Sequence, residues 1–567
     1  MTKAIQNCAS IAGLCAMCIL LWSCGEAGEK PGVKEAANVH QTVVSKRPNF
    51  LIIVADDLGY SDLGAYGGEI NTPNLDRLSK EGLLFTNFYV AGTCAPTRAM
   101  LLTGVDHHRA GLGNMVEHIA PNQRNQPGYE GYLNERVVTM SERLQDAGYR
   151  TYMAGKWHVG SSENSSPAAR GFDRSFVLVR GGANHFDNTG LNGKQHPAPY
   201  REDGVKTSLP EDFSYSTDFY TDKLIQYLDE SKDSDEPFFA YLTYTAPHWP
   251  LQAPPENIAK YEGVYDAGWK VIQEARLNRM KKLGLVSMEA TAPEIVTKYP
   301  AWGELSDHTR QVEARRMEIF AAMVDRLDRK VGELIAFLKE TGQYDNTVIL
   351  FMSDNGNEGA ALQNLPIFAD WIPRFDNSLD NMGEADSYVM IEERWAQVSM
   401  TPHRLFKGMP SDGGIRVPAF ITYGGFKNQG ARHDGVLHVM DIAPTLLSLA
   451  GLEPSVTTYE GREVYPVQGL SMLAALNDPA GSVRGEDDGL GWELFNKKAY
   501  RKGKWKVVHM HQPWGPDAWQ LFDLSVDPGE ANDLADVHPE ILDTLVGEWD
   551  AYAEVNGVIL GDKPPER

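Results

Sequence analysis

Oxygen-bearing side chains follow two of the most apolar runs in the chain. Asp56 and Asp57 come directly after NFLIIVA, and Asp354 and Asn355 come directly after TVILFMS. Carboxylate and amide oxygens suit Ca²⁺ or Mg²⁺ better than Zn²⁺, so the four side chains are candidate ligands of a hard divalent cation. Because Asp, Asn and Gly also favour solvated turns, either motif alone is weak support. Two such pairs after two apolar runs favour a metal site.

Basic side chains and histidines form a second candidate set. They are Arg98, Lys156, His158, His248 and Lys407. Beside a metal ion, such groups could bind a tetrahedral anion and stabilise the charge that develops on it. A single lysine or arginine is usually a solvated surface residue, and a single histidine is often structural. Lys407 has the weakest support from spacing, because RLFKG gives it no strong context.

The chain as a whole is strongly acidic. Its 567 residues carry a formal net charge of −24, with 42% hydrophobic and 23% charged residues. This length suffices for two domains. The acidic balance argues against a nucleic-acid binder, because phosphate backbones require a basic face. An anionic substrate would therefore need a local positive site to overcome the field of the whole protein.

The N-terminal segment is typical of an exported protein. Lys3 precedes an apolar run of secretory-signal length that ends at Leu21-Trp22-Ser23-Cys24. This end resembles a bacterial lipoprotein cleavage box, so we expect a signal segment at 1–24, lipidation of Cys24 and a tether at 25–47. Trp22 is bulky for that box, which leaves an ordinary cleaved signal peptide or an uncleaved anchor as alternatives. The expected location is the periplasm or the cell surface, with membrane contact only through the lipid.

Cys94, in the stretch AGTCAPTRAMLLTG, is then a solitary thiol. The other cysteines all lie in the predicted signal segment: Cys8, Cys15, Cys18 and Cys24. Cys94 would have no disulfide partner within its own chain. Its place at a predicted helix N-terminus would stabilise a thiolate. A cysteine nucleophile, however, needs a base and usually a carbonyl substrate, and a soft thiolate is unusual beside hard metal ligands. Its role stays open between structural thiol, nucleophile, metal ligand and precursor.

The elements that position these residues follow from alternating apolar runs and amphipathic segments. From 48 to 455 the pattern predicts an α/β domain with a large, mostly parallel sheet flanked by helices. Predicted strands cover 49–57, 83–90, 149–158, 237–248 and 346–355, and predicted helices cover 72–82, 95–104, 139–148, 312–342 and 438–451. In open α/β sheets, ligands bind beyond the carboxyl ends of the strands, so we expect the candidate residues to meet at one edge.

The remaining segments predict a smaller domain and a pocket wall. Short antiparallel strands, a turn at Lys502-Gly503 and a helix near 538–553 indicate a C-terminal α+β domain over 456–567. The stretches 182–235 and 356–410 are expected to be long irregular loops, which often line pockets. Their side chains could contact an aryl, steroid or sugar group, although several could instead belong to the core. These side chains are His185, Phe186, Trp371, Phe375, Trp395 and His403.

The stretch C-A-P-T-R followed by LLTG resembles the signature of type I sulfatases. ADDLG, TPNLDRL, GYRTYMAGKWH, TAPHWP, SDNG and LFDLSVDPGE extend the resemblance from about residue 48 to the end. LLTGVDHHRAGLGNM and GYEGYLNERVV look like bacterial arylsulfatases in particular. The resemblance implies an alkaline-phosphatase-like fold and hydrolysis of a sulfate ester, most of all an aryl sulfate. It also implies that a maturation enzyme converts Cys94 to Cα-formylglycine, whose hydrate is a geminal diol.

The same resemblance implies roles for the candidate residues. One diol oxygen would attack sulfur, and the second hydroxyl would then expel sulfate, an exit that a serine nucleophile lacks. Arg98 and His158 would hold the diol, with His158 placed to remove a proton during release. One calcium ion would be bound by Asp56, Asp57, Asp354 and Asn355, and the formylglycine made from Cys94 would complete the set of ligands. The residues that would bind the sulfate ester are Lys156, His248 and Lys407. Either His248 or Lys407 would protonate the leaving oxygen.

Two other functions stay open. One is a phosphodiesterase or phosphonate monoester hydrolase of the same superfamily. Such relatives tend to place histidine among the metal ligands, whereas Asn355 follows Asp354 here. The other is a non-catalytic surface lipoprotein that binds sulfated glycans, which the full set of candidate groups disfavours. The leaving group stays open between aryl, steroid and carbohydrate sulfates.

Overall fold

The structure, a computed structural model, describes residues 47–360, 366–427 and 429–562. They belong to one compact unit, which spans 46–567. The predicted signal segment, Cys24 and the predicted tether up to residue 46 lie outside the described residues. Among the residues that are described, no helix is both long enough and apolar enough to cross a membrane.

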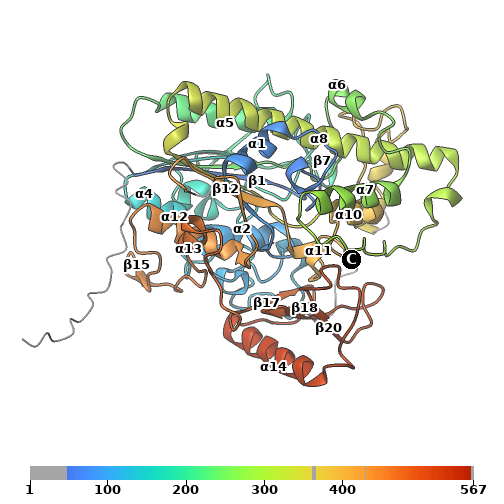
Figure 1. The fold of residues 1–567 in the computed structure, drawn as a ribbon. Coiled ribbons are helices and arrows are strands. Elements are labelled where there is room, and N and C mark those ends of the chain that lie inside the picture. The colour runs from blue at the N-terminus through green and yellow to red at the C-terminus, as the bar shows by residue number, and fades with distance from the viewer. Residues whose placement is uncertain (1–46, 361–365, 428, 563–567) are drawn as a thin grey trace, which may run out of the picture. The chain divides into compact units, whose positions relative to one another are not determined.

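A large mixed sheet organises the described chain (Figure 1). Its strand order is β13 (Ala431–His433), β2 (Leu83–Phe85), β12 (Ala419–Thr422), β11 (Thr347–Ser353), β1 (Asn49–Ala55), β10 (Phe238–Thr243), β4 (Arg150–Lys156), β5 (Arg174–Leu178), β8 (Tyr200–Glu202) and β9 (Val205–Thr207). The five strands from β11 to β5 run parallel, and antiparallel strands flank them. The α/β prediction is confirmed. Because the central strands are parallel and in register, their carboxyl ends meet at one edge.

The sheet is buried on both faces, as parallel sheets usually are. Every residue of β1 is buried. Leu51 and Ile53 contribute to one apolar core, and Ile52 and Val54 contribute to the other, because successive side chains of a strand point to opposite faces. The first core is covered by α1 (Pro73–Glu81), α5 (Ser216–Glu230) and α8 (Asp307–Glu340). The second is covered by α2 (Cys94–Thr103), α4 (Met140–Asp146) and α12 (Ile442–Leu449).

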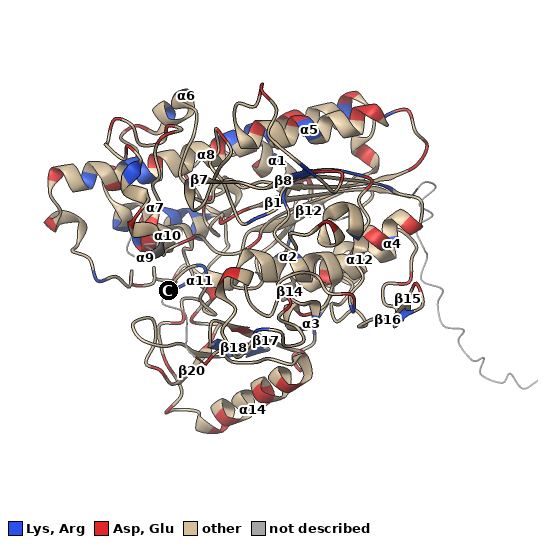
Figure 2. Ribbon diagram, turned by 180° about the vertical axis from the view of Figure 1, so that it is seen from behind, with Lys and Arg blue, Asp and Glu red and all other residues tan. Residues whose placement is uncertain are grey.

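A small antiparallel sheet follows near the end of the chain (Figure 1). It consists of β17 (Gly489–Leu494), β18 (Lys497–Lys502), β19 (Trp505–His509) and β20 (Trp519–Asp523), and α14 (Pro539–Asn556) packs on it. The predicted C-terminal α+β arrangement is therefore confirmed, whereas its boundary at 455/456 stays a prediction. Figure 2 shows acidic residues along α14, whose sequence contains no lysine or arginine.

Three predicted segments differ from the structure. Residues 83–90 do not form one strand: β2 joins the large sheet, and β3 (Phe88–Tyr89) pairs with β14 (Leu437–His438). The Thr86 N–H still donates to the carbonyl of His433 in β13 at 3.1 Å, so the chain leaves the large sheet only after Thr86. The stretches 182–235 and 356–410 are not wholly irregular, since the first contains α5 and the second contains α9 (Pro366–Ala369) and α10 (Glu392–Ser399). The helical pattern was hidden because Ser, Thr and Tyr occupy most of the buried positions of α5.

Candidate active site

The two aspartates after β1 enter the site through a sharp change of backbone direction. The Asp56 N–H donates to the carbonyl of Ala246 at 3.1 Å, and Asp57 adopts a left-handed conformation with φ of 66°. Asp residues tolerate this region better than most. Both carboxylates are buried. The turn therefore directs two adjacent acids into the protein rather than into solvent.

Asp354, after β11, is tied to the helix that carries Cys94. Its Oδ2 accepts from Nε and Nη2 of Arg98 at 3.0 and 2.7 Å, and Arg98 Nη1 donates to the carbonyl of Lys156 at 2.8 Å. Cys94 is the first residue of α2, so Arg98 lies about one turn after it on the same side. The Cys94 Sγ lies 3.5 Å from Oδ1 of Asp56. The C-A-P-T-R spacing thus places the thiol beside Asp56 and the guanidinium on Asp354, two carboxylates of the same cluster.

Two buried lysines complete the charged cluster. Lys156 Nζ donates to Asp56 Oδ2 at 2.7 Å, and Lys407 Nζ donates to Asp57 Oδ1 at 2.7 Å. Lys407 comes from a loop without regular structure, which is held by a hydrogen bond from its N–H to the carbonyl of Asn357 at 3.0 Å. The three predicted acids therefore each have one buried cation as a direct partner.

The two predicted histidines lie beside this cluster as neutral rings. His158 has φ of 60°, and its Nδ1 has no partner among the described residues. His248 Nδ1–H donates to the carbonyl of Trp249 at 2.6 Å, so Nε2, 3.7 Å from Asp57 Oδ2, carries the lone pair. Burial, together with the nearby lysines, holds the pKa of both rings well below its ordinary value. Both rings are therefore uncharged, and each keeps one ring nitrogen with a free lone pair.

The donor set fits a hard divalent cation. Ligand atoms of Asp56, Asp57, Asp354 and Cys94 lie within 4.8 Å of one another. The Oδ1 of Asn355 is buried without a partner among the described residues, which is costly unless a ligand satisfies it. Burial raises the pKa of Asp57 to about 7, and burial likewise raises the pKa of Asp56. A divalent ion would reverse this penalty by stabilising the charged carboxylates.

The Cys94 thiol itself is poorly suited to act as a thiolate. Burial raises its pKa above the ordinary value, and the opposing pull of Lys156 and Lys407 does not overcome this. Asp354 behaves in the opposite way. Although burial alone would raise its pKa, Arg98 and the lysines hold the pKa of Asp354 below its usual value. The cluster therefore keeps one firmly charged acid and disfavours a negative sulfur.

The predicted pocket-wall residues divide into three groups. Trp371 and Phe375 join Trp249, Ile372, Tyr388 and Met390 in an aromatic cluster beside His248, whose ring centroid is 4.7 Å from that of Trp249. His185 is buried against Ser216, and Phe186 packs on Tyr215. Trp395 lies instead in the core, where it packs edge-on against Trp269 and Trp302. The expectation that Trp395 lines the pocket is wrong, because the helix that carries it, α10 (Glu392–Ser399), is buried along its whole length.

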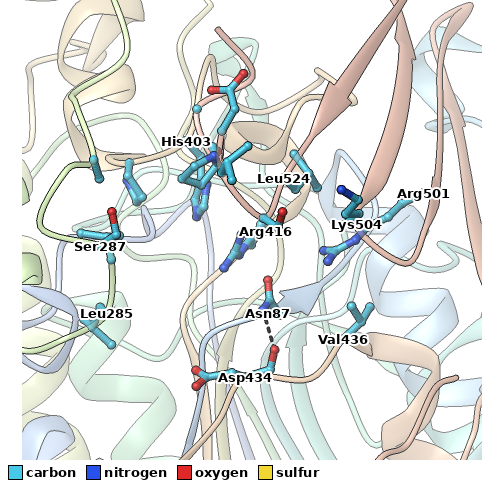
Figure 3. Close-up of a pocket in the computed structure, with 18 of the residues that line it drawn as sticks. Asn87, Leu285, Ser287, His403, Arg416, Asp434, Val436, Arg501, Lys504 and Leu524 are labelled. Carbon is cyan, nitrogen blue, oxygen red and sulfur yellow. Dashed lines mark hydrogen bonds between the residues drawn. The ribbon is translucent and has the colours of Figure 1, made fainter. Parts of the chain in front are cut away.

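His403 was also expected at the pocket, but it lines a different cavity (Figure 3). This cavity of about 930 Å³ lies between the segment 285–294, Arg416 and the β18–β19 turn. It contains none of the predicted catalytic or metal-binding residues. Its cations are paired within the protein: Arg416 with Asp412 and Lys504 with Asp523. This cavity is therefore not the site of the predicted chemistry.

Two further residues of the cluster were missed from sequence. Glu358 lies 3.5 Å from Lys407 Nζ and is buried. Both polar side-chain atoms of Asn357 are buried without a partner among the described residues. The signal was present, because both residues continue the SDNG loop as SDNGNEG. Their role could not be inferred from spacing, since their contacts depend on the distant loop of Lys407.

A family model described as Sulfatase matches residues 48–452. The chain therefore belongs to the sulfatase family, and it is a sulfuric ester hydrolase. It is 42% identical over 534 residues to an uncharacterized sulfatase of Schizosaccharomyces pombe, with 91% of this chain and 95% of that protein covered. It is 37% identical over 435 residues to an arylsulfatase of Klebsiella aerogenes, with 76% and 92% covered.

Solved structures show the same fold. Ps i-CgsB in complex with k-i-k-neocarrahexaose has a TM-score of 0.64 at 25% identity, with 91% of this chain and 95% of that chain covered. The phosphonate monoester hydrolase of Agrobacterium radiobacter has a TM-score of 0.53 at 20% identity, with 90% and 96% covered, and it shows the fold alone. The alkaline-phosphatase-like architecture is thus confirmed.

Proposed function

We propose that this sulfatase hydrolyses aryl sulfates through a formylglycine made from Cys94, with one calcium ion bound beside it. The observation that carries the proposal is the position of Cys94. Its sulfur lies 3.5 Å from Asp56, in a buried cluster with three carboxylates and three cations. A thiol held there is a weak nucleophile, because burial raises the pKa of Cys94. Its conversion to a hydrated aldehyde would supply hydroxyl nucleophiles without requiring a thiolate.

Calcium would be held by Asp56, Asp57, Asp354, Asn355 and the modified residue 94. When bound, it would supply positive charge and polarise the oxygens that it contacts. Together with Glu358, the three aspartates exceed the cations Arg98, Lys156 and Lys407 by one negative formal charge. A divalent ion would leave an excess of one positive charge. This is the local positive site that an anionic ester needs in a protein of net charge −24.

The side chains around the cluster would then divide the work. Arg98, fixed by two bonds to Asp354, would hold residue 94 in place. His158, a neutral ring, would accept a proton during sulfate release. Lys156, His248 and Lys407 would bind the sulfate oxygens. Of the two predicted proton donors, Lys407 is the one that carries a proton to give in this arrangement, because Asp57 keeps the pKa of Lys407 above its ordinary value despite burial, whereas burial keeps His248 neutral.

The aryl preference rests on a relative and on the pocket wall. The protein of Klebsiella aerogenes that shares 37% identity is an arylsulfatase. The aromatic cluster of Trp249, Trp371, Phe375 and Tyr388 lies beside His248, where a leaving group would extend from the sulfate. Aromatic rings stack on aryl groups, although they also stack on sugar faces. Carbohydrate sulfates are therefore the second substrate class to assay.

The test is a mass measurement combined with a substrate panel. In protein from its native host, the peptide containing residue 94 is expected to be about 18 Da lighter than the unmodified sequence, as replacement of the thiol by an aldehyde requires. Purified enzyme is expected to turn over a chromogenic aryl sulfate faster than an aryl phosphonate, a phosphate diester or a sulfated sugar. An unmodified Cys94 in active protein would overturn the formylglycine proposal. Faster turnover of the phosphonate would overturn the assignment to sulfate.

Export and lipidation are a separate part of the proposal. They rest on the sequence of residues 1–24 alone. In the native host, we expect the protein to fractionate with membranes, to be released by a lipase that cleaves lipoprotein acyl chains, and to become soluble on Cys24→Ala substitution. A soluble wild-type protein in the periplasm would instead support an ordinary cleaved signal peptide.

A further inference from the structure

Two histidines and an aspartate converge on the β19–β20 hairpin, far along the chain from the catalytic residues. His509 is the last residue of β19, and His511 is two positions later. Alternate residues of an extended strand point to the same side, which brings the two rings together. Asp517 lies on the returning arm of the hairpin. Its N–H donates to the carbonyl of Met510 at 3.0 Å, so the backbone holds the carboxylate beside the two rings.

The separations suit a single small cation. One ligand atom from each of the three residues lies within 4.8 Å of the other two. His511 Nδ1 is 2.7 Å and His509 Nε2 is 3.9 Å from Asp517 Oδ1. Ligand atoms about 2.0–2.2 Å from a tetrahedral zinc ion are roughly 3.4 Å apart. The observed distances lie on either side of that value, so small side-chain rotations would reach it.

The rings can rotate, and solvent can reach them. His509 Nδ1 and His511 Nε2, the nitrogens away from Asp517, have no partner among the described residues, so no hydrogen bond fixes the rings on that side. The side chains of His509, His511 and Asp517 are 14%, 33% and 60% exposed. An ion could therefore enter without local unfolding.

We propose that His509, His511 and Asp517 bind one divalent transition-metal ion of the zinc class, separately from the calcium proposed at the catalytic cluster. Two imidazoles and one carboxylate favour such an ion over Ca²⁺, which prefers six or more oxygen ligands. Water would occupy the remaining position. Binding at His511 Nδ1 would require the proton that this nitrogen now donates to Asp517 to move to Nε2 of the same ring.

The hairpin connects this site to the catalytic loop. Trp514, between the two arms, packs edge-on against Phe406 with ring centroids 4.9 Å apart. Phe406 immediately precedes Lys407, whose ammonium contacts Asp57. A metal that joins the two arms would therefore stabilise the packing behind Lys407. We expect this metal to stabilise the enzyme rather than take part in the reaction.

The experiment is a titration of the purified full-length enzyme with Zn²⁺, in the presence of saturating Ca²⁺ so that the hard site is blocked. Calorimetry is expected to show one Zn²⁺ per chain and a higher melting temperature. His511→Ala and His509→Ala are each expected to weaken Zn²⁺ binding by about 10-fold or more. His308→Ala, an exposed histidine on α8, is the matched control and is expected to bind as the wild type does.

Cobalt provides the readout that separates this site from Cys94. Co²⁺ bound by imidazole and carboxylate is expected to show visible ligand-field bands without a thiolate charge-transfer band. The proposal is overturned if wild-type enzyme binds no Zn²⁺ under these conditions, if both histidine variants bind it unchanged, or if the Co²⁺ spectrum shows a thiolate ligand. The first two outcomes would leave the formylglycine proposal intact, whereas a thiolate ligand would indicate unconverted Cys94, which the mass of the residue 94 peptide tests independently.

Discussion

Two buried clusters of titratable groups differ in how many of their hydrogen-bonding atoms have a partner within the protein. The catalytic cluster contains Asp56, Asp57 and Asp354 with three cations. The second, here called the His108 cluster, consists of Asp106, His107, His108, Glu493 and Tyr552. In it, His108 Nδ1 and Nε2 donate to Asp106 and Glu493 at 2.9 and 3.1 Å, and Tyr552 donates to Asp106 at 2.8 Å. Both clusters have the donor types and proximity of a metal centre, but only the first retains unsatisfied ligand atoms.

The pKa values show the same contrast. In the His108 cluster, hydrogen bonds to Asp106 and Glu493 outweigh burial and raise the pKa of His108 to about 9. Its charge is thereby neutralised by partners on both sides. In the catalytic cluster, burial raises the pKa of Asp57 to about 7 despite Lys407, and Asn355 Oδ1 has no partner among the described residues. Convergence of charged groups therefore does not identify a site by itself. The informative feature is an acceptor that the protein leaves unsatisfied.

The largest effect is expected from Cys94→Ala. If residue 94 supplies the nucleophile, kcat/KM should fall by about 10⁵-fold or more, as for other nucleophile deletions. The fold should be retained, because the sulfur has a single weak contact, 3.5 Å from Asp56. The measurement is turnover of an aryl sulfate together with the melting temperature. Substantial activity in a folded C94A protein would place the chemistry outside this cluster.

Calcium removal should have the next largest effect. Dialysis against a chelator is expected to lower kcat by about 10²–10³-fold, because preorganised positive charge of this kind has that magnitude. Added Ca²⁺ should restore activity. The His108 cluster provides a control, because His108→Gln should still bind one Ca²⁺, as measured by atomic emission. Loss of calcium from H108Q but not from Asp57→Asn would reverse the two assignments.

His108→Gln should instead lower stability. The folded pKa of about 9 exceeds the unfolded value of 6.5, so protonation of His108 stabilises the native state. That contribution, about 3 kcal/mol by the size of the shift, is complete below pH 6.5 and is lost as the pH rises through 9. The difference in unfolding free energy between wild type and H108Q should therefore shrink between pH 6.5 and 10. A difference that grows over this range would contradict the charged His108.

Site residues could be predicted from the sequence where they directly follow a predicted strand. NFLIIVADD and TVILFMSDN carry their own signals, because the apolar run predicts the strand and the acids follow it directly. Lys407 could be reached only through the family resemblance, since a tertiary hydrogen bond from its N–H to Asn357 positions its loop. His108 and Glu493 are 385 residues apart, so their pairing could not be read from spacing. Contacts made by irregular loops and between distant segments depend on the complete fold.

The smallest effect is expected for an ion pair that is exposed to solvent rather than buried. Arg77 and Glu81 lie 3.8 Å apart at i,i+4 on α1, with side chains 46% and 38% exposed. Solvent and salt screen such a pair, so Arg77→Gln should change the unfolding free energy by no more than about 0.5 kcal/mol. Urea denaturation of wild type, R77Q and H108Q at pH 6 measures both effects together. If R77Q lost as much stability as H108Q, burial and partner geometry would not explain why the His108 cluster is structural, and its distinction from the catalytic cluster would need another cause.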